Sequence, residues 1–246
     1  MLSPREWSLL LGIAAAAANV LGGLVVILRK HWNELILKYF LALGAGFMLG
    51  ATLLRMLPVS LSLSPEAPTL ILAGYFIVHF FEHTVAPHFH FGEEVHSDVM
   101  VNPAVSYSAM VGLSTHTLFD GISIASGFMV SVPLGFVIFF AVVLHKIPEG
   151  FTAASIALAS GHGPRGAFVA SLVLAATTMA GVLGMQQFAG AVPYALPIST
   201  GVALYVAASD LMPEVNEERG IRMALVVFLG VALFALTDRG LSALGL

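Results

Sequence analysis

The amino-acid sequence predicts an all-α membrane protein that crosses the bilayer eight times. Of its 246 residues, 58% are hydrophobic and only 10% are charged, and the mean hydropathy is +0.94. A soluble core could not bury this much apolar surface. The apolar residues also form long runs, close to the roughly 20 residues that a helix needs to cross the hydrocarbon layer. Composition and run length together predict a polytopic integral membrane protein.

Eight apolar runs follow one another along the chain, and we expect residues 1–246 to form a single transmembrane domain. The expected spans are residues 7–28, 35–57, 69–86, 104–130, 133–159, 166–188, 193–212 and 222–243. The first run is longer than a usual signal-peptide core and lacks a strongly basic flank, since Arg5 is followed by Glu6. We therefore expect it to be retained as a span.

Basic residues predict the orientation, because Lys and Arg are enriched in cytoplasmic loops. The connections after the first, fifth and seventh spans contain Arg29, Lys30, Arg165, Arg219 and Arg222. We expect this side to be cytoplasmic, both termini to lie outside, and the membrane to be the plasma (cell inner) membrane. The net charge of −4 does not suggest a nucleic-acid partner. The absence of cysteine excludes disulfides and thiolate metal sites.

The second and seventh spans resemble each other at an offset of 155 residues. This offset aligns Gly46 with Gly201, Leu49 with Leu204 and Pro58 with Pro213. Five crossings separate the two spans, so they would run in opposite directions, and inverted repeats of this kind are typical of membrane transporters. Spans 1–3 and 6–8 would then form two repeats around spans 4 and 5. The alternative is that small residues and a closing Leu-Pro recur in unrelated membrane helices.

Spans 4 and 5 each contain a histidine and a carboxylate four residues apart. The pairs are His116 with Asp120 and His145 with Glu149. Residues at this spacing share one face of a helix. A carboxylate at the centre of a membrane helix costs roughly 2.5–3.5 kcal/mol on insertion scales, so such groups face a cavity, an ion or each other. Two such helices could hold a divalent cation; the alternative is hydrogen bonding between helices, which Ser and Thr provide at lower cost.

These motifs are similar to the paired signatures of the ZIP (Zrt/Irt-like) family of divalent-metal transporters. The first is His116-x3-Asp120-Gly121 and the second is His145-x-Ile-Pro-Glu149, while residues 201–214 resemble the seventh span of that family. The resemblance implies transport of Zn²⁺ or a related ion towards the cytoplasm, through a site on spans 4 and 5.

The resemblance also implies a set of ligands. The four signature residues His116, Asp120, His145 and Glu149 would bind the metal, and Met48 of the second span is a further candidate through its thioether sulfur. Besides Zn²⁺, these ligand types admit Fe²⁺, Mn²⁺, Co²⁺ or Cd²⁺. We expect no cofactor beyond the transported ion. The expected partners are that ion and the lipid bilayer, with a homodimer left open.

The chain departs from the family at a second metal position that many members have next to the first. Here the corresponding residues are Thr117, Lys146 and Thr178. An ammonium group cannot ligate a cation while it is protonated and repels one nearby. We therefore predict a site for a single metal ion, with Lys146 in place of a second one. The alternative is that Lys146 turns away, or pairs with Asp120 or Glu149.

Other histidines lie near the inner end of the third span. His79-x-x-Glu82-His83 matches a pattern in which two helical histidines hold zinc and the glutamate is a general base, so an intramembrane zinc metallohydrolase is the alternative function. The motif suits an exit route for metal equally well. The loop at about 87–103 contains His88, His90 and His96, and is either a cytoplasmic metal-capturing strip or a solvated linker.

Overall fold

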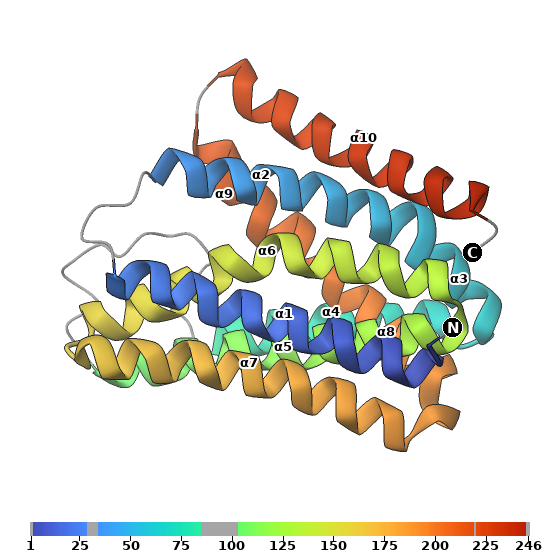
Figure 1. The fold of residues 1–246 in the computed structure, drawn as a ribbon, viewed down its shortest axis with the longest axis horizontal. Coiled ribbons are helices and arrows are strands. Elements are labelled where there is room, and N and C mark those ends of the chain that lie inside the picture. Colours follow the sequence, from blue (N-terminus) through green and yellow to red (C-terminus); the bar gives the residue numbers. More distant parts are fainter. Residues whose placement is uncertain (1, 29–33, 85–102, 219, 245–246) are drawn as a thin grey trace.

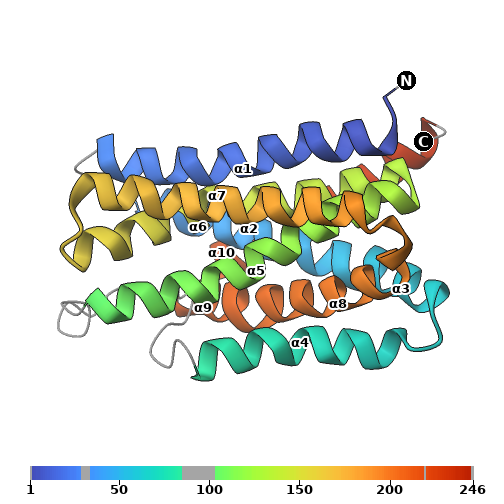
Figure 2. The ribbon, with the colours of Figure 1, turned by 90° about the horizontal axis from the view of Figure 1, so that it is seen from below.

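The computed structural model describes residues 2–28, 34–84, 103–218 and 220–244. Within these ranges the chain is helical and contains no strand, which confirms the predicted fold class. Eight long helical segments run along the longest axis of the molecule, as Figures 1 and 2 show.

Six of these segments are single helices. They are α1 (Pro4–Leu28), α4 (Ala67–Thr84), α5 (Pro103–Val130), α6 (Val132–Ala159), α7 (Gly163–Gln187) and α10 (Ile221–Ala243). The other two are composite, each with a π-helical turn. The first consists of α2 (Glu34–Ala51), η1 (Thr52–Met56) and α3 (Leu57–Leu63). The second consists of the 3₁₀ turn η2 (Ala189–Ala191), α8 (Val192–Tyr205), η3 (Val206–Leu211) and α9 (Met212–Glu217).

Six of the eight segments in the described ranges are long and apolar enough to cross a membrane by length and composition. The other two, α4 and α5, each contain polar residues that the sequence analysis singled out. α4 carries His79, Glu82 and His83 near its end, and α5 carries His116 and Asp120 in its middle. These composition data support an integral membrane protein.

Two prolines that were expected to close the second and seventh spans lie inside longer helical segments instead. Pro58 and Pro213 each occupy the second position of the helix that follows a π-helical turn. A proline lacks the N–H of its own helical bond and crowds the carbonyl four residues earlier, which in both cases belongs to the π-helical turn. The wider turn accommodates the proline and lets the helix continue.

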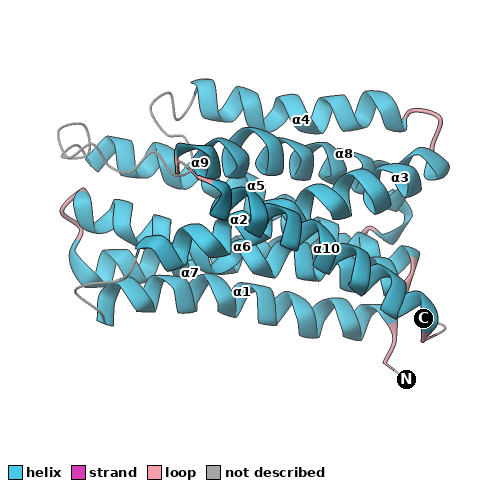
Figure 3. Ribbon diagram, turned by 90° about the horizontal axis from the view of Figure 1, so that it is seen from above, coloured by secondary structure: helices cyan, strands magenta, loops and turns pink. Residues whose placement is uncertain are grey.

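The inverted repeat is visible in how these segments pack. α2 lies against α10, and α8 lies against α4, in the view of Figure 3. A Cβ on Gly46 of α2 would collide with the carbonyl oxygen of Val227, and one on Gly201 of α8 would collide with that of Ile71. Gly46 and Gly201 are the residues that the offset of 155 aligns. The two halves of the chain therefore place a glycine at equivalent positions, where each allows a neighbouring helix to approach closely.

The first residues of α1 and the last residues of α10 lie at the same end of the bundle (Figures 1 and 2). This placement fits an even number of crossings. That this end faces outwards stays a prediction. α1, α5, α6 and α7 pack against one another and form the part of the bundle in which the candidate site lies.

Candidate metal centre

Five ionisable side chains are buried where α5 and α6 meet. α5 contributes His116 and Asp120, and α6 contributes His145, Lys146 and Glu149. Each of the five is at most 3% exposed. Because the residues of each pair are four apart, they project from one face of their helix. The structure thus brings the two sequence motifs together in one enclosed space.

Glycines next to the carboxylates allow the neighbouring helices to approach. A Cβ on Gly121 would collide with the carbonyl oxygen of Thr178 on α7, and one on Gly150 with that of Asn19 on α1. Both contacts are between backbones, where no side chain could move aside. The sequence places a glycine directly after each carboxylate because the turn that carries the carboxylate is pressed against an outer helix.

Three close contacts join the charged groups of the site. His116 Nε2 lies 2.8 Å from Glu149 Oε1. Lys146 Nζ lies 2.7 Å from Asp120 Oδ2 and 2.6 Å from Glu149 Oε2. The ammonium therefore bridges both carboxylates, which is the pairing alternative that the sequence left open for this lysine. With both histidines neutral, the two carboxylates and one ammonium leave one net negative charge in a buried space.

His145 is oriented by its own helix. Its Nδ1 lies 3.0 Å from the carbonyl oxygen of Ala141, an acceptor, so Nδ1 carries a proton, and in the neutral imidazole Nε2 has the lone pair. Nε2 in turn lies 3.4 Å from Asp120 Oδ2. A histidine whose second nitrogen donates to a backbone carbonyl is the usual arrangement of an imidazole prepared to bind metal.

His116, Asp120 and Glu149 form a group of three potential metal ligands. One ligand atom of each lies within 4.8 Å of those of the other two. Among the described residues, this is the one group of three or more histidine or acidic side chains that converges in this way. His145 does not belong to it. Nitrogen and oxygen donors together with an uncompensated negative charge suit a divalent ion such as Zn²⁺.

The two threonines predicted at the second metal position are turned towards their own helices. The Thr117 hydroxyl donates to the carbonyl of Ser114 at 3.0 Å, and that of Thr178 donates to the carbonyl of Leu174 at 3.1 Å. Both side chains are fully buried. Each hydroxyl oxygen keeps lone pairs, but the strong anionic groups of the region are Asp120 and Glu149, and Lys146 occupies them.

Asn19 of α1 is a site residue that the sequence analysis missed. With its amide oriented to satisfy its neighbours, the side-chain nitrogen donates to the carbonyl of Lys146 at 2.8 Å and to Glu149 Oε2 at 3.2 Å. It is fully buried. The available signal was an asparagine inside an otherwise apolar run, next to the small residues that press α1 against α6.

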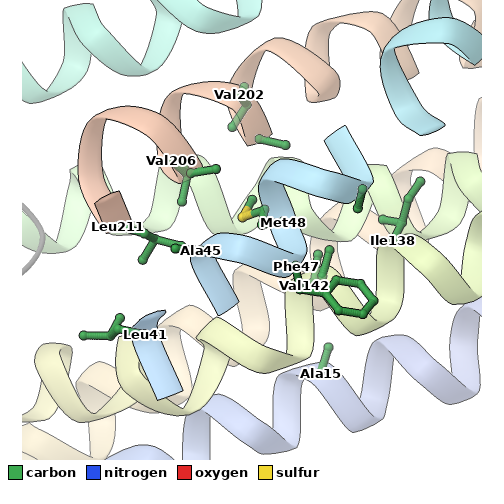
Figure 4. Close-up of a cluster of buried hydrophobic side chains, with 14 of the residues drawn as sticks. Ala15, Leu41, Ala45, Phe47, Met48, Ile138, Val142, Val202, Val206 and Leu211 are labelled. Carbon is green, nitrogen blue, oxygen red and sulfur yellow. The ribbon is translucent and has the colours of Figure 1, made fainter. Parts of the chain in front are cut away.

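Met48 lies in the hydrophobic core. It is 1% exposed and belongs to a cluster that includes Ala45, Val202 and Val206, as Figure 4 shows. These neighbours come from α2 itself, α8 and the following π-helical turn. Their contacts explain the residue as packing, and its role as a ligand stays a prediction.

The His79-x-x-Glu82-His83 motif forms the C-terminal part of α4. The rings of His79 and His83 are 4.1 Å apart, and His83 Nδ1 is 2.9 Å from the carbonyl oxygen of His79. Glu82 is turned inwards and interacts with Tyr205 and with Asp210. Glu82 therefore faces the seventh segment rather than a zinc ion held by its two histidines. His88, His90 and His96 of the loop lie outside the described residues.

Comparison with known proteins identifies related sequences. A family model described as ZIP Zinc transporter matches residues 92–238, which is more than half of the chain. This range contains both signature helices, α5 and α6, and the composite segment with the second π-helical turn. It begins after the His79-x-x-Glu82-His83 motif.

Several curated relatives are named zinc transporters. Zinc transporter ZIP13 of Danio rerio is 30% identical over 129 residues, 47% of this chain and 36% of that protein. Zinc transporter ZIP4 of Homo sapiens is 28% identical over 128 residues, 50% of this chain and 20% of that protein. Zinc transporter foi of Drosophila melanogaster is 24% identical over 141 residues, 56% of this chain and 20% of that protein.

These alignments therefore cover about a fifth to about a third of the length of those relatives. Their names describe transporters and not enzymes, so the metallohydrolase alternative finds no support in them.

Proposed function

The chain belongs to the ZIP zinc transporter family, and on this basis we propose that it carries a divalent metal ion, foremost Zn²⁺, across the membrane towards the cytoplasm. The path leads through the buried site between α5 and α6. The membrane is the plasma (cell inner) membrane, with both termini outside.

One observation carries this proposal: His116, Asp120 and Glu149 converge inside a bundle of apolar helices. Burying carboxylates in a membrane is unfavourable unless they act on an ion or a partner. Lys146 compensates only one of the two negative charges. The remaining charge and the two neutral imidazoles give an entering cation the ligands that replace its water.

The metal ligands in this proposal are His116, Asp120, Glu149 and His145, with Met48 as a fifth candidate. Lys146 makes the site mononuclear, because its ammonium holds the carboxylate oxygens that a second ion would need. Glu149 uses different oxygens for His116 and Lys146. An ion can therefore enter on the side of Oε1 while Lys146 stays bound to Oε2.

Transport follows alternating access around this fixed site, in which the two repeats open it first to one side and then to the other. On the inner side, His79, Glu82 and His83 are positioned to receive the released ion. A histidine must be neutral to ligate a metal, so protons compete with binding. Uptake therefore decreases as the outer pH falls into the histidine range, and uptake that stays flat from about pH 8 to 5 would contradict this.

The test is Zn²⁺ flux into proteoliposomes that contain a fluorescent zinc indicator. Wild type is compared with His116→Ala and Glu149→Ala, and with Ser62→Ala at an exposed position as the matched control. We expect flux in wild type and control and none in the two site variants. Equal flux in all four, or none in wild type for any of several divalent ions, would refute the proposal.

Glu82→Gln separates transport from hydrolysis in the same assay. A hydrolase needs the carboxylate as its base, whereas transport does not require this residue to abstract a proton. Retained flux in this variant supports transport that needs no such base, whereas lost flux would place Glu82 on the path by which the ion is released.

A further inference from the structure

An apolar groove of about 630 Å³ opens on the side of the bundle between α5 and α7. Its lining residues follow helical spacing from Tyr107 to Leu118 on α5 and from Gly166 to Thr177 on α7. The two helices lie next to each other and begin at the same end of the bundle, as Figure 2 shows. The groove therefore runs along both helices from that end.

Small residues create the groove. Ala157 of α6, and Gly166 and Ala170 of α7, leave space where larger side chains would fill the helix interface. The rim is apolar and exposed, with Val111 at 45%, Val169 at 55% and Val173 at 41%. Val169 and Val173 lie on α7, which is long and apolar enough to cross a membrane, and α5 is an expected span beside it, so in this proposal the groove faces lipid. Its length along α5 is about 16 Å at 1.5 Å per residue, roughly half of the 30 Å hydrocarbon layer.

The end of the groove is polar and positively charged. His162 lines it, and the His162 ring lies 5.6 Å from the ring of Tyr107. The His162 Nε2 atom is buried and has no hydrogen-bond partner among the described residues. Arg165 is exposed and precedes the lining residue Gly166. The first turn of α7 has no side-chain cap, so its backbone N–H groups are available to an anion.

We propose that this groove binds an anionic phospholipid, with one acyl chain between α5 and α7 and the phosphate at the start of α7. The apolar walls fit the chain, and Arg165, His162 and the N–H groups complement the phosphate. The start of α7 lies on the side of the membrane that the sequence predicts to be cytoplasmic, so the lipid belongs to the inner leaflet. The inference rests on the membrane location of the chain and is independent of metal transport.

Native mass spectrometry of the purified full chain in neutral detergent tests the proposal with phosphatidylglycerol and phosphatidylcholine as probes. Val173→Trp fills the groove. Leu172→Trp is the matched control, because both residues are 41% exposed on α7 and Leu172 does not line the groove. Arg165→Gln removes the charge at the mouth, and Arg222→Gln removes one elsewhere as its control.

We expect wild type, Leu172→Trp and Arg222→Gln to retain phosphatidylglycerol in preference to phosphatidylcholine. Val173→Trp should bind at least fivefold less, and Arg165→Gln should lose the preference. Equal lipid binding by Val173→Trp and Leu172→Trp would overturn the proposal. So would equal retention of both lipids by wild type, or a dimer that Val173→Trp dissociates without any change in bound lipid, since that result would assign the groove to a second copy of the chain.

Discussion

α5 and α6, the two helices that carry the site, can be compared residue by residue at an offset of 29. This offset aligns His116 with His145, Thr117 with Lys146, Asp120 with Glu149 and Gly121 with Gly150. Both histidines and both carboxylates are buried, and both glycines touch a carbonyl of an outer helix. The second pair differs: the Thr117 hydroxyl bonds within α5, whereas the Lys146 ammonium reaches both carboxylates.

The comparison separates what forms the site from what sets its charge. The histidine, the carboxylate and the glycine recur in both helices and build an enclosed space lined from both sides. Lys146, which replaces the threonine of α5, adds a permanent cation to that space. The shared pattern therefore predicts where an ion binds, and Lys146 determines how many ions fit and how tightly.

The largest effect is expected when either carboxylate is neutralised. Asp120→Asn and Glu149→Gln keep the side-chain size but remove the charge that offsets Lys146. Breaking a buried ion pair lowers the free energy of unfolding by up to about 3–5 kcal/mol. Zn²⁺ flux should fall by more than about tenfold, because changing a residue that only supports a metal ligand already costs about that much. Flux into proteoliposomes and thermal unfolding in detergent measure the two effects.

The two helices should not respond equally. Glu149 contacts His116 and Asn19 in addition to Lys146, so Glu149→Gln should be the more damaging change. Flux within twofold of wild type in both variants would rule out this site as the conduction path.

Lys146→Thr gives α6 the threonine that α5 has at the aligned position and should strengthen metal binding. The variant removes a cation that lies 2.6–2.7 Å from both carboxylates. Because the ammonium repels a cation strongly at such a distance, removing it should strengthen Zn²⁺ binding by about 1.4 kcal/mol, which lowers Kd about tenfold. Competition with a zinc indicator measures it, and metal analysis should show bound Zn²⁺ rising above one per chain.

Lys38→Thr is the control, since Lys38 pairs with Glu218 at the edge of the bundle. Weaker binding in Lys146→Thr, together with unchanged binding in the control, would mean that the ammonium supports the site instead of competing for it.

His116→Ala and His145→Ala should differ although the sequence gives both residues the same status. His116 belongs to the converging group, whereas His145 is held by the Ala141 carbonyl and lies 3.4 Å from Asp120. We expect His116→Ala to abolish flux and His145→Ala, which removes a ligand outside that group, to keep roughly a tenth. The reverse order would show that His145 is the stronger ligand during transport.

Much of this arrangement could be predicted from the sequence, because its signals are local. Composition and apolar run length predicted the helical segments, and a spacing of four placed His116 with Asp120 and His145 with Glu149 on common faces. The offset of 155 aligned Gly46 with Gly201, and the structure shows these two glycines making equivalent contacts.

The rest depends on contacts between distant parts of the chain. Asn19 meets Glu149 only because α1 packs on α6. The sequence left Lys146 free to replace a metal, to pair or to turn away, and only the separation of α5 and α6 decides that it bridges. Pro58 was expected to end a helix, but a π-helical turn before it lets the helix continue.

The smallest effect is expected at a second pair of aligned positions outside the site. Arg55 of the first repeat lies 3.4 Å from Asp238, and the residue 155 positions later, Asp210, interacts with the carboxyl group of Glu82. Arg55 and Asp238 are partly exposed, so Asp238→Asn should lower stability by no more than about 1 kcal/mol. Asp210 is 2% exposed, and its carboxyl group faces the Glu82 carboxyl inside the bundle.

Because Asp210→Asn replaces one of two facing buried acids with an amide whose N–H₂ group can donate to the other, it should raise the melting temperature in detergent while Asp238→Asn lowers it. If both variants lose stability to the same extent, the acidic pair is as well compensated as the ion pair. The two repeats would then be equivalent at this position, and the difference between α5 and α6 at Lys146 would be the one that matters for the ion.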